Sequence, residues 1–283
     1  MLVLNGKAVS EKKRADIKSR VSLFKGKYSR SPGLAVVIVG DDPASHVYVK
    51  NKIKSCEEVG IVSFHHQLDA QTTETELLAL IQKLNGDKSV DGILVQLPLP
   101  PHLSADKIVA AIRPDKDADG LTVENMGLLF SGKPRVVPCT PRGVIEILKY
   151  YDISMAGKNC VVVGRSQIVG RPMAQLLLLE DATVTVAHSK TPDVSAITRT
   201  ADIVVVAAGR PRMLGADDFK KNAVVVDVGI HRLPDGLCGD VRFEELKSHA
   251  HAATPVPGGV GPMTITILLE NTLVLAEKLQ AGR

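Results

Sequence analysis

Aromatic residues are scarce in this sequence, and tryptophan is absent. Phe, Tyr and Trp together make up 3% of the 283 residues. Proteins that hold single-stranded nucleic acid stack its bases on aromatic side chains, so we expect no nucleic-acid partner. The formal net charge of +4 is mild. It suits a small anionic ligand, although solubility alone explains a charge of this size equally well.

Cysteine is scarce as well. The four cysteines are Cys56, Cys139, Cys160 and Cys238. No two of them form a C-x-x-C pair, and none has a metal-site spacing to a histidine, so we expect no metal. Cys160 lies in an apolar run and Cys56 on an apolar helical stripe. We therefore expect the cysteines to be buried free thiols in a reducing compartment.

Uninterrupted apolar runs are short. None approaches the roughly 18 residues of a membrane-spanning helix, so we expect no membrane partner. The first residues lack the apolar core of a secretory signal, and Glu11 and Asp16 argue against a transit peptide. We therefore expect a cytoplasmic protein. Its composition, 45% apolar and 23% charged, is that of a globular chain, and its length allows two domains.

The segment 159–172 contains the strongest local pattern. A β-branched run ends at Gly164, a second glycine follows at Gly170, and Pro172 opens a leucine-rich helix. Strand, tight turn and helix predict the phosphate-binding corner of a dinucleotide fold. The spacing is not the usual G-x-G-x-x-G, because Arg165 and Ser166 replace its middle. A plain glycine turn in another kind of α/β protein would give the same pattern.

The next strands indicate which nucleotide is bound. An NAD-binding domain usually has an acidic residue after its second strand, roughly 20 residues beyond the glycine turn. Here the strand 182–187 is followed by His188, Ser189 and Lys190. Together with Arg165 these residues favour NADP, unless Ser189 and Lys190 form only a surface turn. Two later strands end in glycine, and we expect Gly229 and Ile230 to contact the nicotinamide.

The first half of the chain also alternates strands and helices. On the helix that begins at Pro43, Tyr48 and Lys52 lie four residues apart at one edge of an apolar stripe. An ordinary pair at a helix boundary would have the same spacing. Gln96 directly follows the strand 92–95, at the edge where open α/β sheets bind ligands. The aspartates at 115, 117 and 119 lack the later residues of a calcium loop, so we reject a metal there.

Seven segments together resemble one family. They are Tyr48–Lys52, Val95–Pro98, Lys116–Gly120, Pro138–Pro141, Gly164–Gly170, His188–Lys190 and Pro257–Thr264. In this order, and over nearly the whole length, the chain resembles the bifunctional methylenetetrahydrofolate dehydrogenase/methenyltetrahydrofolate cyclohydrolases. The glycine-rich segment Pro257–Thr264, which precedes the last helix, is the most specific of the seven.

The resemblance implies two reactions of one-carbon metabolism in one cleft. NADP⁺ oxidises 5,10-methylenetetrahydrofolate to the methenyl compound, and water then opens the ring to give 10-formyltetrahydrofolate. Lys52 would be the catalytic lysine, as proton acceptor or by orienting water. Tyr48 would stack on the substrate, Gln96 would hold Lys52, and Asp119 would hydrogen-bond the pterin. The other implied folate contacts are Val95, Leu97, Pro257, Gly258, Gly259, Val260 and Gly261, and the implied cofactor contacts are Gly164, Arg165, Ser166, Ser189, Gly229 and Ile230.

The resemblance also implies a fold and an assembly. It predicts two α/β domains: a catalytic, folate-binding domain of residues 1–138 and 263–283, and a Rossmann-type NADP-binding domain of residues 139–262. The last helix would pack back on the first domain. The family works as a homodimer through its nucleotide domain.

Three alternatives compete with this interpretation. Tyr-x-x-x-Lys also marks short-chain dehydrogenases, but there the nucleotide turn precedes the tyrosine, whereas here it follows. An NADP-dependent shikimate-type dehydrogenase has the same domain order, yet it leaves Pro257–Thr264 unexplained. A non-catalytic NADP-sensing protein would have no use for Lys52, Gln96 and Asp119 together.

Overall fold

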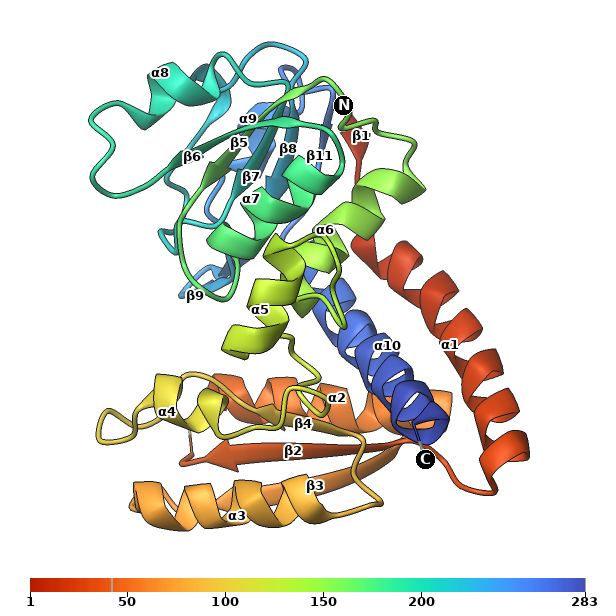
Figure 1. Ribbon diagram of the computed structural model, residues 1–283. Helices are drawn as coiled ribbons and strands as arrows, with labels where there is room; N and C mark the ends of the chain where they lie inside the picture. The colour runs from red at the N-terminus through yellow and green to blue at the C-terminus, as the bar shows by residue number, and fades with distance from the viewer. Residues whose placement is uncertain (42, 283) are drawn as a thin grey trace. The chain divides into compact units, whose positions relative to one another are not determined.

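The computed structural model describes residues 1–41 and 43–282, without the side chains of residues 43–48. Contacts divide the chain into two compact units, each containing one parallel sheet (Figure 1). We call Met1–Glu11 with Pro138–Thr264 the large-sheet unit, and Lys12–Val137 with Ile265–Arg283 the small-sheet unit. The borders at Glu11 and Thr264 fall inside the long helices α1 (Gly6–Tyr28) and α10 (Val260–Ala281).

The large-sheet unit is built on six strands. They are β1 (Leu2–Val3), β5 (Asn159–Val163), β6 (Thr183–Ala187), β7 (Ile203–Val206), β8 (Val224–Asp227) and β11 (Ala252–Ala253). Their order is β1-β11-β8-β7-β5-β6, and every pairing is parallel. The three central strands, β5, β7 and β8, are valine-rich and almost entirely buried, as expected where helices cover both faces of a parallel sheet.

Helices cover both faces of the large sheet. On one face, Val163 and Val206 pack with Phe219 and Leu246, which come from the region of α8 (Val194–Thr198), η1 (Ala216–Asp218) and α9 (Phe243–Leu246). Side chains alternate along a strand, so Val162 points to the opposite face. There α7 (Gly170–Leu179) lies across β5 and β6 beside α6 (Cys139–Tyr150), as Figure 1 shows. A hairpin of β9 (His231–Leu233) and β10 (Gly236–Cys238) completes the unit.

The first eleven residues belong to the large-sheet unit, whereas the sequence analysis places them in the first domain. Leu2 and Val3 pair in register with Ala252 and Ala253, which makes β1 the edge strand of the large sheet. Two-residue strands show no alternation of apolar and polar residues, so neither β1 nor β11 has a recognisable pattern in the sequence. At the other borders the observed division lies within two residues of the predicted one.

The small-sheet unit is built on three parallel strands. These are β2 (Gly33–Val39), β3 (Val62–Leu68) and β4 (Gly92–Val95), in the order β3-β2-β4. One face packs against α3 (Glu74–Gly86) and α4 (Ala105–Ala110). Helix α2 (Pro43–Val59) packs against β2 and β3, and α5 (Val123–Phe130) follows the last strand. These two α/β units confirm the predicted fold class.

Helix α10 ends the chain inside the small-sheet unit, which confirms that the last helix packs back on the first half of the sequence. Over 18 residues its mean hydropathy reaches 1.2, so by length and composition it could cross a membrane. The sequence analysis missed this because it considered only uninterrupted apolar runs. Asn271, however, is buried and donates hydrogen bonds to the carbonyls of Ala118 and Val137, each at 2.9 Å. These bonds identify α10 as a core helix.

All four cysteines are buried and free, as predicted. Desolvation by burial raises the pKa of both Cys56 and Cys160 to about 12. The thiols therefore stay protonated and unreactive at neutral pH.

Candidate active site

Both sheets have a topological switch point, where successive strands are added on opposite sides of the first one. In the small sheet β3 lies on one side of β2 and β4 on the other. In the large sheet β6 and β7 flank β5 in the same way. Open α/β sheets bind ligands at the carboxyl ends of the strands at such points. The relevant edges are therefore Gly40 and Gln96 in one unit, and Gly164 and Ala207 in the other.

Lys52 and Gln96 meet at the switch point of the small sheet. The Nζ of Lys52 donates to Oε1 of Gln96 at 2.7 Å. The Nε2 of Gln96 in turn donates to the carbonyl of Leu97 at 2.6 Å, which turns the amide oxygen toward the lysine. The backbone N–H of Gln96 donates to the carbonyl of Val37 on the neighbouring strand β2 at 2.8 Å. The lysine is thus held by a side chain whose own orientation is set.

Lys52 lies deeper than its sequence position suggests. Only 7% of it is exposed, whereas Ile53, predicted on the apolar stripe, is half-buried. Val49 and Cys56, one turn away on either side, are buried. An amine surrounded in this way keeps little hydration, so its polar partner decides where it points. The predicted contact between Gln96 and Lys52 is present.

The other predicted folate contacts of this unit differ in how far their side chains are exposed. Tyr48 belongs to α2, one turn before Lys52, and its side chain lies outside the described residues. The Val95 side chain is part of the hydrophobic core, so only its backbone can face a ligand. Leu97 and Asp119 are half-buried.

A neighbouring aspartate, which the sequence analysis does not propose as a site residue, shapes the loop around Asp119. Asp117 is buried and accepts hydrogen bonds from the N–H groups of Gly120 and Thr122 and from Nδ2 of Asn125, at 2.8–2.9 Å. Asp117 also forms an isolated parallel bridge with Ile93 of β4. The loop is therefore fastened beside the sheet, and Asp117 has a structural role.

Glycine is required at the switch point of the large sheet. Gly164 has φ of +130°, and a Cβ there would lie 2.2 Å from the carbonyl oxygen of Ala207. At Gly170 a Cβ would lie 2.3 Å from the carbonyl oxygen of Gly164. The turn thus closes on itself so tightly that neither position admits a side chain. Such a turn lets a ligand approach the backbone and the start of α7.

Ser166 and Arg165 occupy the same turn. The hydroxyl of Ser166 accepts from the N–H groups of Val169 and Gly170 at 3.2 and 3.3 Å. Ser166 therefore has a structural role besides the predicted contact with the cofactor. The Arg165 side chain is exposed.

The segment after β6 is a hydrogen-bonded turn. His188 N donates to Oγ1 of Thr191 at 2.9 Å, and Lys190 N donates to Nδ1 of His188 at 3.2 Å. The backbone of Ser189 and Lys190 is therefore a surface turn, as the alternative interpretation expects. Both residues are exposed, so their side chains remain accessible to a ligand. Gly164 N bonds the carbonyl of Ala187 at 2.8 Å, which brings this turn beside the glycine turn and Arg165.

The remaining predicted contacts of the large-sheet unit come together around the start of α10. A Cβ on Gly261 would lie 3.4 Å from Cδ1 of Ile230, whose residue is 42% exposed. Gly259 is buried, and a Cβ on Gly6 would lie 1.9 Å from its carbonyl oxygen. The carbonyl of Gly258 accepts from Lys7 N at 3.1 Å. Pro257 is exposed, and Val260 and Gly261 already belong to the helix.

Asp240 is a buried residue that the sequence analysis does not single out. It is fully buried, and its carboxylate accepts from the N–H groups of Ala208, Gly209 and Arg210, at 2.6, 2.9 and 2.9 Å. Nε2 of His231 lies 2.7 Å from its Oδ1. These partners are up to 32 positions away in the sequence, so no local motif indicates the site.

A second buried carboxylate, Asp227, ends β8 beside Asp240. It accepts from the N–H groups of Gly229, Asp240 and Val241 at 2.9, 3.0 and 2.9 Å. Burial raises the pKa of Asp227 to about 6; these hydrogen bonds oppose the rise, and the charge of Asp240 adds to it. In the described part of the chain, no group of three or more His, Cys, Asp or Glu residues is arranged to hold a metal ion.

Comparison with known families agrees with this architecture. Residues 4–119 match the tetrahydrofolate dehydrogenase/cyclohydrolase catalytic domain, and residues 138–280 match the NAD(P)-binding domain of the same family. The chain belongs to the tetrahydrofolate dehydrogenase/cyclohydrolase family.

Relatives from this family match over almost the full length. "Bifunctional protein FolD" of Bdellovibrio bacteriovorus is 59% identical, covering 98% of this chain and 97% of that protein. The crystal structure of the bifunctional FolD enzyme of Campylobacter jejuni is 50% identical, with a TM-score of 0.95 and 99% of each chain covered. The Trypanosoma brucei enzyme, complexed with NADP cofactor and inhibitor, is 39% identical, with a TM-score of 0.95 and coverage of 99% and 98%.

Family membership also decides among the alternatives. A shikimate dehydrogenase from Aquifex aeolicus is 16% identical with a TM-score of 0.56, covering 89% of this chain and 93% of that one. At that identity the likeness shows a related fold alone. The shikimate-type and cofactor-sensing interpretations are therefore not favoured.

Proposed function

We propose that the protein is a bifunctional enzyme of one-carbon metabolism. It oxidises 5,10-methylenetetrahydrofolate to 5,10-methenyltetrahydrofolate with NADP⁺, and it hydrolyses that product to 10-formyltetrahydrofolate. The observation that carries this proposal is the buried pair of Lys52 and Gln96 at one switch point, in a chain whose other switch point has the glycine turn of the family's NAD(P)-binding domain.

The large-sheet edge fits NADP. The turn at Gly164 and Gly170 keeps side chains away from the backbone at the start of α7, where a pyrophosphate can be bound. The segment after β6 presents Ser189 and Lys190 in place of the usual carboxylate, and Arg165 is exposed next to it. An arginine beside the ribose accommodates the 2′-phosphate that distinguishes NADP from NAD. When bound, NADP⁺ supplies the hydride acceptor.

The oxidation step needs alignment of the one-carbon bridge with the cofactor more than acid or base catalysis. The protein's contribution is to hold the folate. We propose that Tyr48 stacks on it, that Asp119 hydrogen-bonds the pterin, and that the segment Pro257–Gly261 contacts it. Val95 is the last residue of β4 and Leu97 follows it by two positions, so both lie at the carboxyl end of this strand.

The hydrolysis step releases one proton. Water adds to the amidinium carbon of the methenyl compound, and cleavage of the ring C–N bond leaves the formyl group on one nitrogen. We propose that Nζ of Lys52 exchanges the proton or orients the water, because Gln96 holds it in place at 2.7 Å. Proton transfer requires that the catalytic group lie within hydrogen-bond reach of the reacting water, and the bond to Gln96 limits the directions in which the amine can point.

We further propose a homodimer formed through the large-sheet unit, in the cytoplasm. Strand β6 is an edge of the sheet, and Val186 on it is 38% exposed. Leu178 and Leu179 at the end of α7 are 55% and 44% exposed. An unpaired edge beside exposed leucines is the kind of surface that a second copy covers. Sedimentation analysis of the protein and of a Val186→Lys variant tests this arrangement, since the variant should shift toward the monomer.

A direct assay tests the catalytic proposal. The protein is mixed with 5,10-methylenetetrahydrofolate and NADP⁺, and the formation of NADPH and of methenyltetrahydrofolate is followed by absorbance. Hydrolysis is measured separately, starting from methenyltetrahydrofolate without cofactor. Both activities should be present, and NADP⁺ should be preferred to NAD⁺. A protein that binds NADP⁺ but catalyses neither step would be a cofactor-sensing protein instead.

A further inference from the structure

The loop that follows β7 begins at the large-sheet switch point. Its first residue, Ala207, presents the carbonyl that faces the α-carbon of Gly164. The next three N–H groups converge on one oxygen pair, the carboxylate of Asp240. Successive N–H groups that converge in this way form an anion-binding concavity. Here the anion is a fully buried side chain of the protein itself.

The far end of this loop is held by the same short segment, Gly239–Arg242. Arg212 N donates to the carbonyl of Gly239 at 2.9 Å, and Leu214 N donates to the carbonyl of Asp240 at 3.2 Å. Leu214 also forms a parallel bridge with Val241. Four consecutive residues therefore hold the loop along most of its length.

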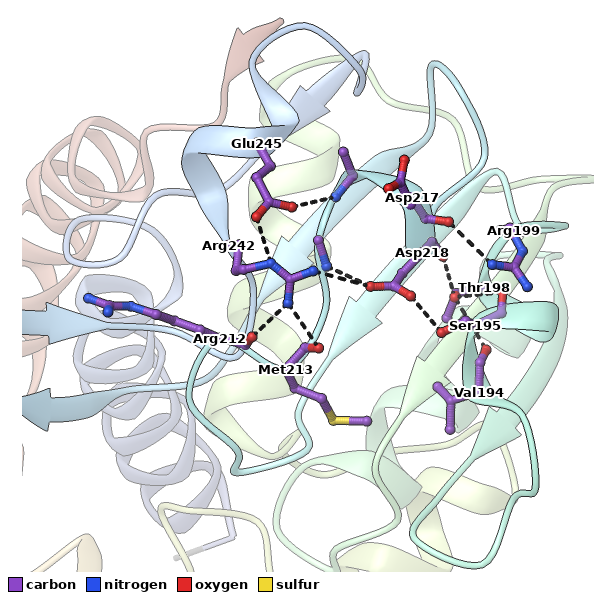
Figure 2. A network of polar contacts seen from close by, with 12 residues as sticks. Val194, Ser195, Thr198, Arg199, Arg212, Met213, Asp217, Asp218, Arg242 and Glu245 are labelled. Carbon is purple, nitrogen blue, oxygen red and sulfur yellow. Dashed lines mark hydrogen bonds and ion pairs between the residues drawn. The ribbon is translucent and has the colours of Figure 1, made fainter.

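The guanidinium of Arg242 completes the far attachment, as Figure 2 shows. Its Nη1 donates to the carbonyls of Arg212 and Met213 at 3.0 and 3.3 Å. Its Nε bonds Glu245 at 2.7 Å, and its Nη2 lies 3.7 Å from Asp218. This network lies toward α8 and α9, at the end of the loop remote from Ala207. The two ends of the loop are thus held by different side chains, Asp240 and Arg242.

Asp240 is itself set by neighbours on β8 and on the hairpin. Its N–H donates to Asp227, and its Oδ1 contacts His231, whose side chain is 20% exposed. A Cβ on Gly229 would lie 2.4 Å from the same Oδ1. Asp240 therefore links the carboxyl ends of β7 and β8, through its carboxylate on one side and its backbone N–H to Asp227 on the other. Gly229 and Ile230, which follow β8, are expected to contact the nicotinamide.

We propose that Asp240 is a positioning residue for hydride transfer. This inference rests on the proposed function. The Asp240 carboxylate fixes the backbone of 208–210 next to the switch point and fills the space beside Gly229. It also occupies the N–H groups of 208–210, so the cofactor phosphates are left to the turn from Gly164 to Gly170. Hydrolysis of methenyltetrahydrofolate uses no NADP⁺ and depends on Lys52, so Asp240 acts on the dehydrogenase step alone.

The first test is Asp240→Asn, with both activities measured on the same preparation. The amide has the same shape but replaces one accepting oxygen with a donor, which cannot face the N–H groups. We expect the dehydrogenase kcat to fall on the order of 10- to 100-fold, because a small misplacement of reacting groups is costly. Hydrolysis should stay within about twofold of the unsubstituted protein. Equal loss of both activities in a folded variant, or loss of neither, would overturn the proposal.

Arg242→Ala is the matched control. It removes the other side chain of the same segment that holds the same loop, but at the end remote from Gly164. We expect a lower melting temperature with a dehydrogenase kcat within about threefold of the unsubstituted protein. A dehydrogenase loss as large as that of Asp240→Asn would show that the loop needs only general support, and would also overturn the proposal.

A second pair of variants decides the question if Asp240→Asn does not fold. His231→Leu removes one donor to the carboxylate and leaves its three backbone partners, so a smaller dehydrogenase loss of about 3- to 10-fold is expected. His231→Gln keeps a donor and should restore most of the rate. If Leu and Gln behave alike, the carboxylate does not set the geometry. An unsubstituted protein without either activity would refute the proposed function instead.

Discussion

The two switch points of this protein follow one topological rule but are built from different chemical groups. In the small sheet the edge displays side chains, with Lys52 held by Gln96. In the large sheet it displays backbone, with Gly164 and Gly170 leaving no room for side chains. In a site built from side chains, a substitution can remove the catalytic group while the surrounding backbone keeps its shape. In a site built from backbone, the geometry changes only if a Cβ is added or if the groups that hold the backbone are removed.

The sharpest test of this contrast is Lys52→Met. Methionine fills the buried space without an amine, so the fold and NADP⁺ binding should survive. The hydrolysis rate should fall about 10²- to 10⁴-fold, the usual contribution of a positioned acid or base. Rates are measured from methenyltetrahydrofolate, and cofactor binding by titration. Lys54→Met, on an exposed position of the same helix, is the control and should be unchanged. Undiminished hydrolysis in Lys52→Met would remove Lys52 from the mechanism.

The large-sheet edge should carry an electrostatic cost that comes from the buried carboxyl group of Asp227. The pKa of Asp227 is about 6 when folded and about 3.8 when unfolded, so the folded state binds the proton more tightly. Ionisation therefore destabilises the fold, and the cost appears as pH rises from about 4 to about 6. Relative to Asp227→Asn, the protein should lose up to about 3 kcal/mol over that window.

Unfolding in urea at several pH values, followed by circular dichroism because the chain has no tryptophan, measures this difference. The groups that face Asp227 are Asp240 and the three N–H donors, and they are present in both proteins. Asp202→Asn is a control of opposite sign, because the bond from Lys220 lowers the pKa of Asp202. A difference for Asp227→Asn that does not vary with pH would mean that its carboxyl titrates normally.

Gly164→Ala tests the backbone site directly. The added Cβ would collide with the carbonyl of Ala207, so the turn must open. We expect a dehydrogenase loss of about 10- to 100-fold with hydrolysis retained. Gly236→Ala is a matched control, since Gly236 has a similar φ of +123° but no atom within 4 Å of the place that an alanine methyl group would take. Equal losses in the two variants would assign the effect to backbone strain alone.

The smallest predicted effect concerns the choice of cofactor. Arg165→Ala should weaken NADP⁺ binding about tenfold and NAD⁺ binding much less, because only NADP⁺ carries the 2′-phosphate that an arginine can pair with. Arg171→Ala, also exposed and on α7, should change neither. Binding constants for both cofactors measure the effect, and an equal loss for both would place the 2′-phosphate elsewhere.

The sequence predicts a large part of this architecture because buried parallel strands are continuous apolar runs. The strands at 92–95 and 159–163 and the glycine turn were recognised in this way, and so was the place of Gln96 at the end of its strand. The contact of Gln96 with Lys52 was expected only from the resemblance to the family. The two-residue strands β1 and β11 were missed because they contain too few residues for a pattern. Asp240 and Asp227 were missed for another reason. Most of their partners are backbone N–H groups, which every residue type except proline provides, so no residue pattern can indicate the contact.

The chain passes from one unit to the other more than once, so neither unit corresponds to one continuous fragment. The borders at 11, 137 and 264 make both units discontinuous, and two of them cut through long helices. A fragment that begins at Pro138 would lack β1, leaving β11 as an uncovered sheet edge. A fragment that stops before Ile265 would lack Asn271 and its bonds to Ala118 and Val137. Neither unit can be produced as an intact fragment, so the two activities must be separated by single substitutions rather than by truncation.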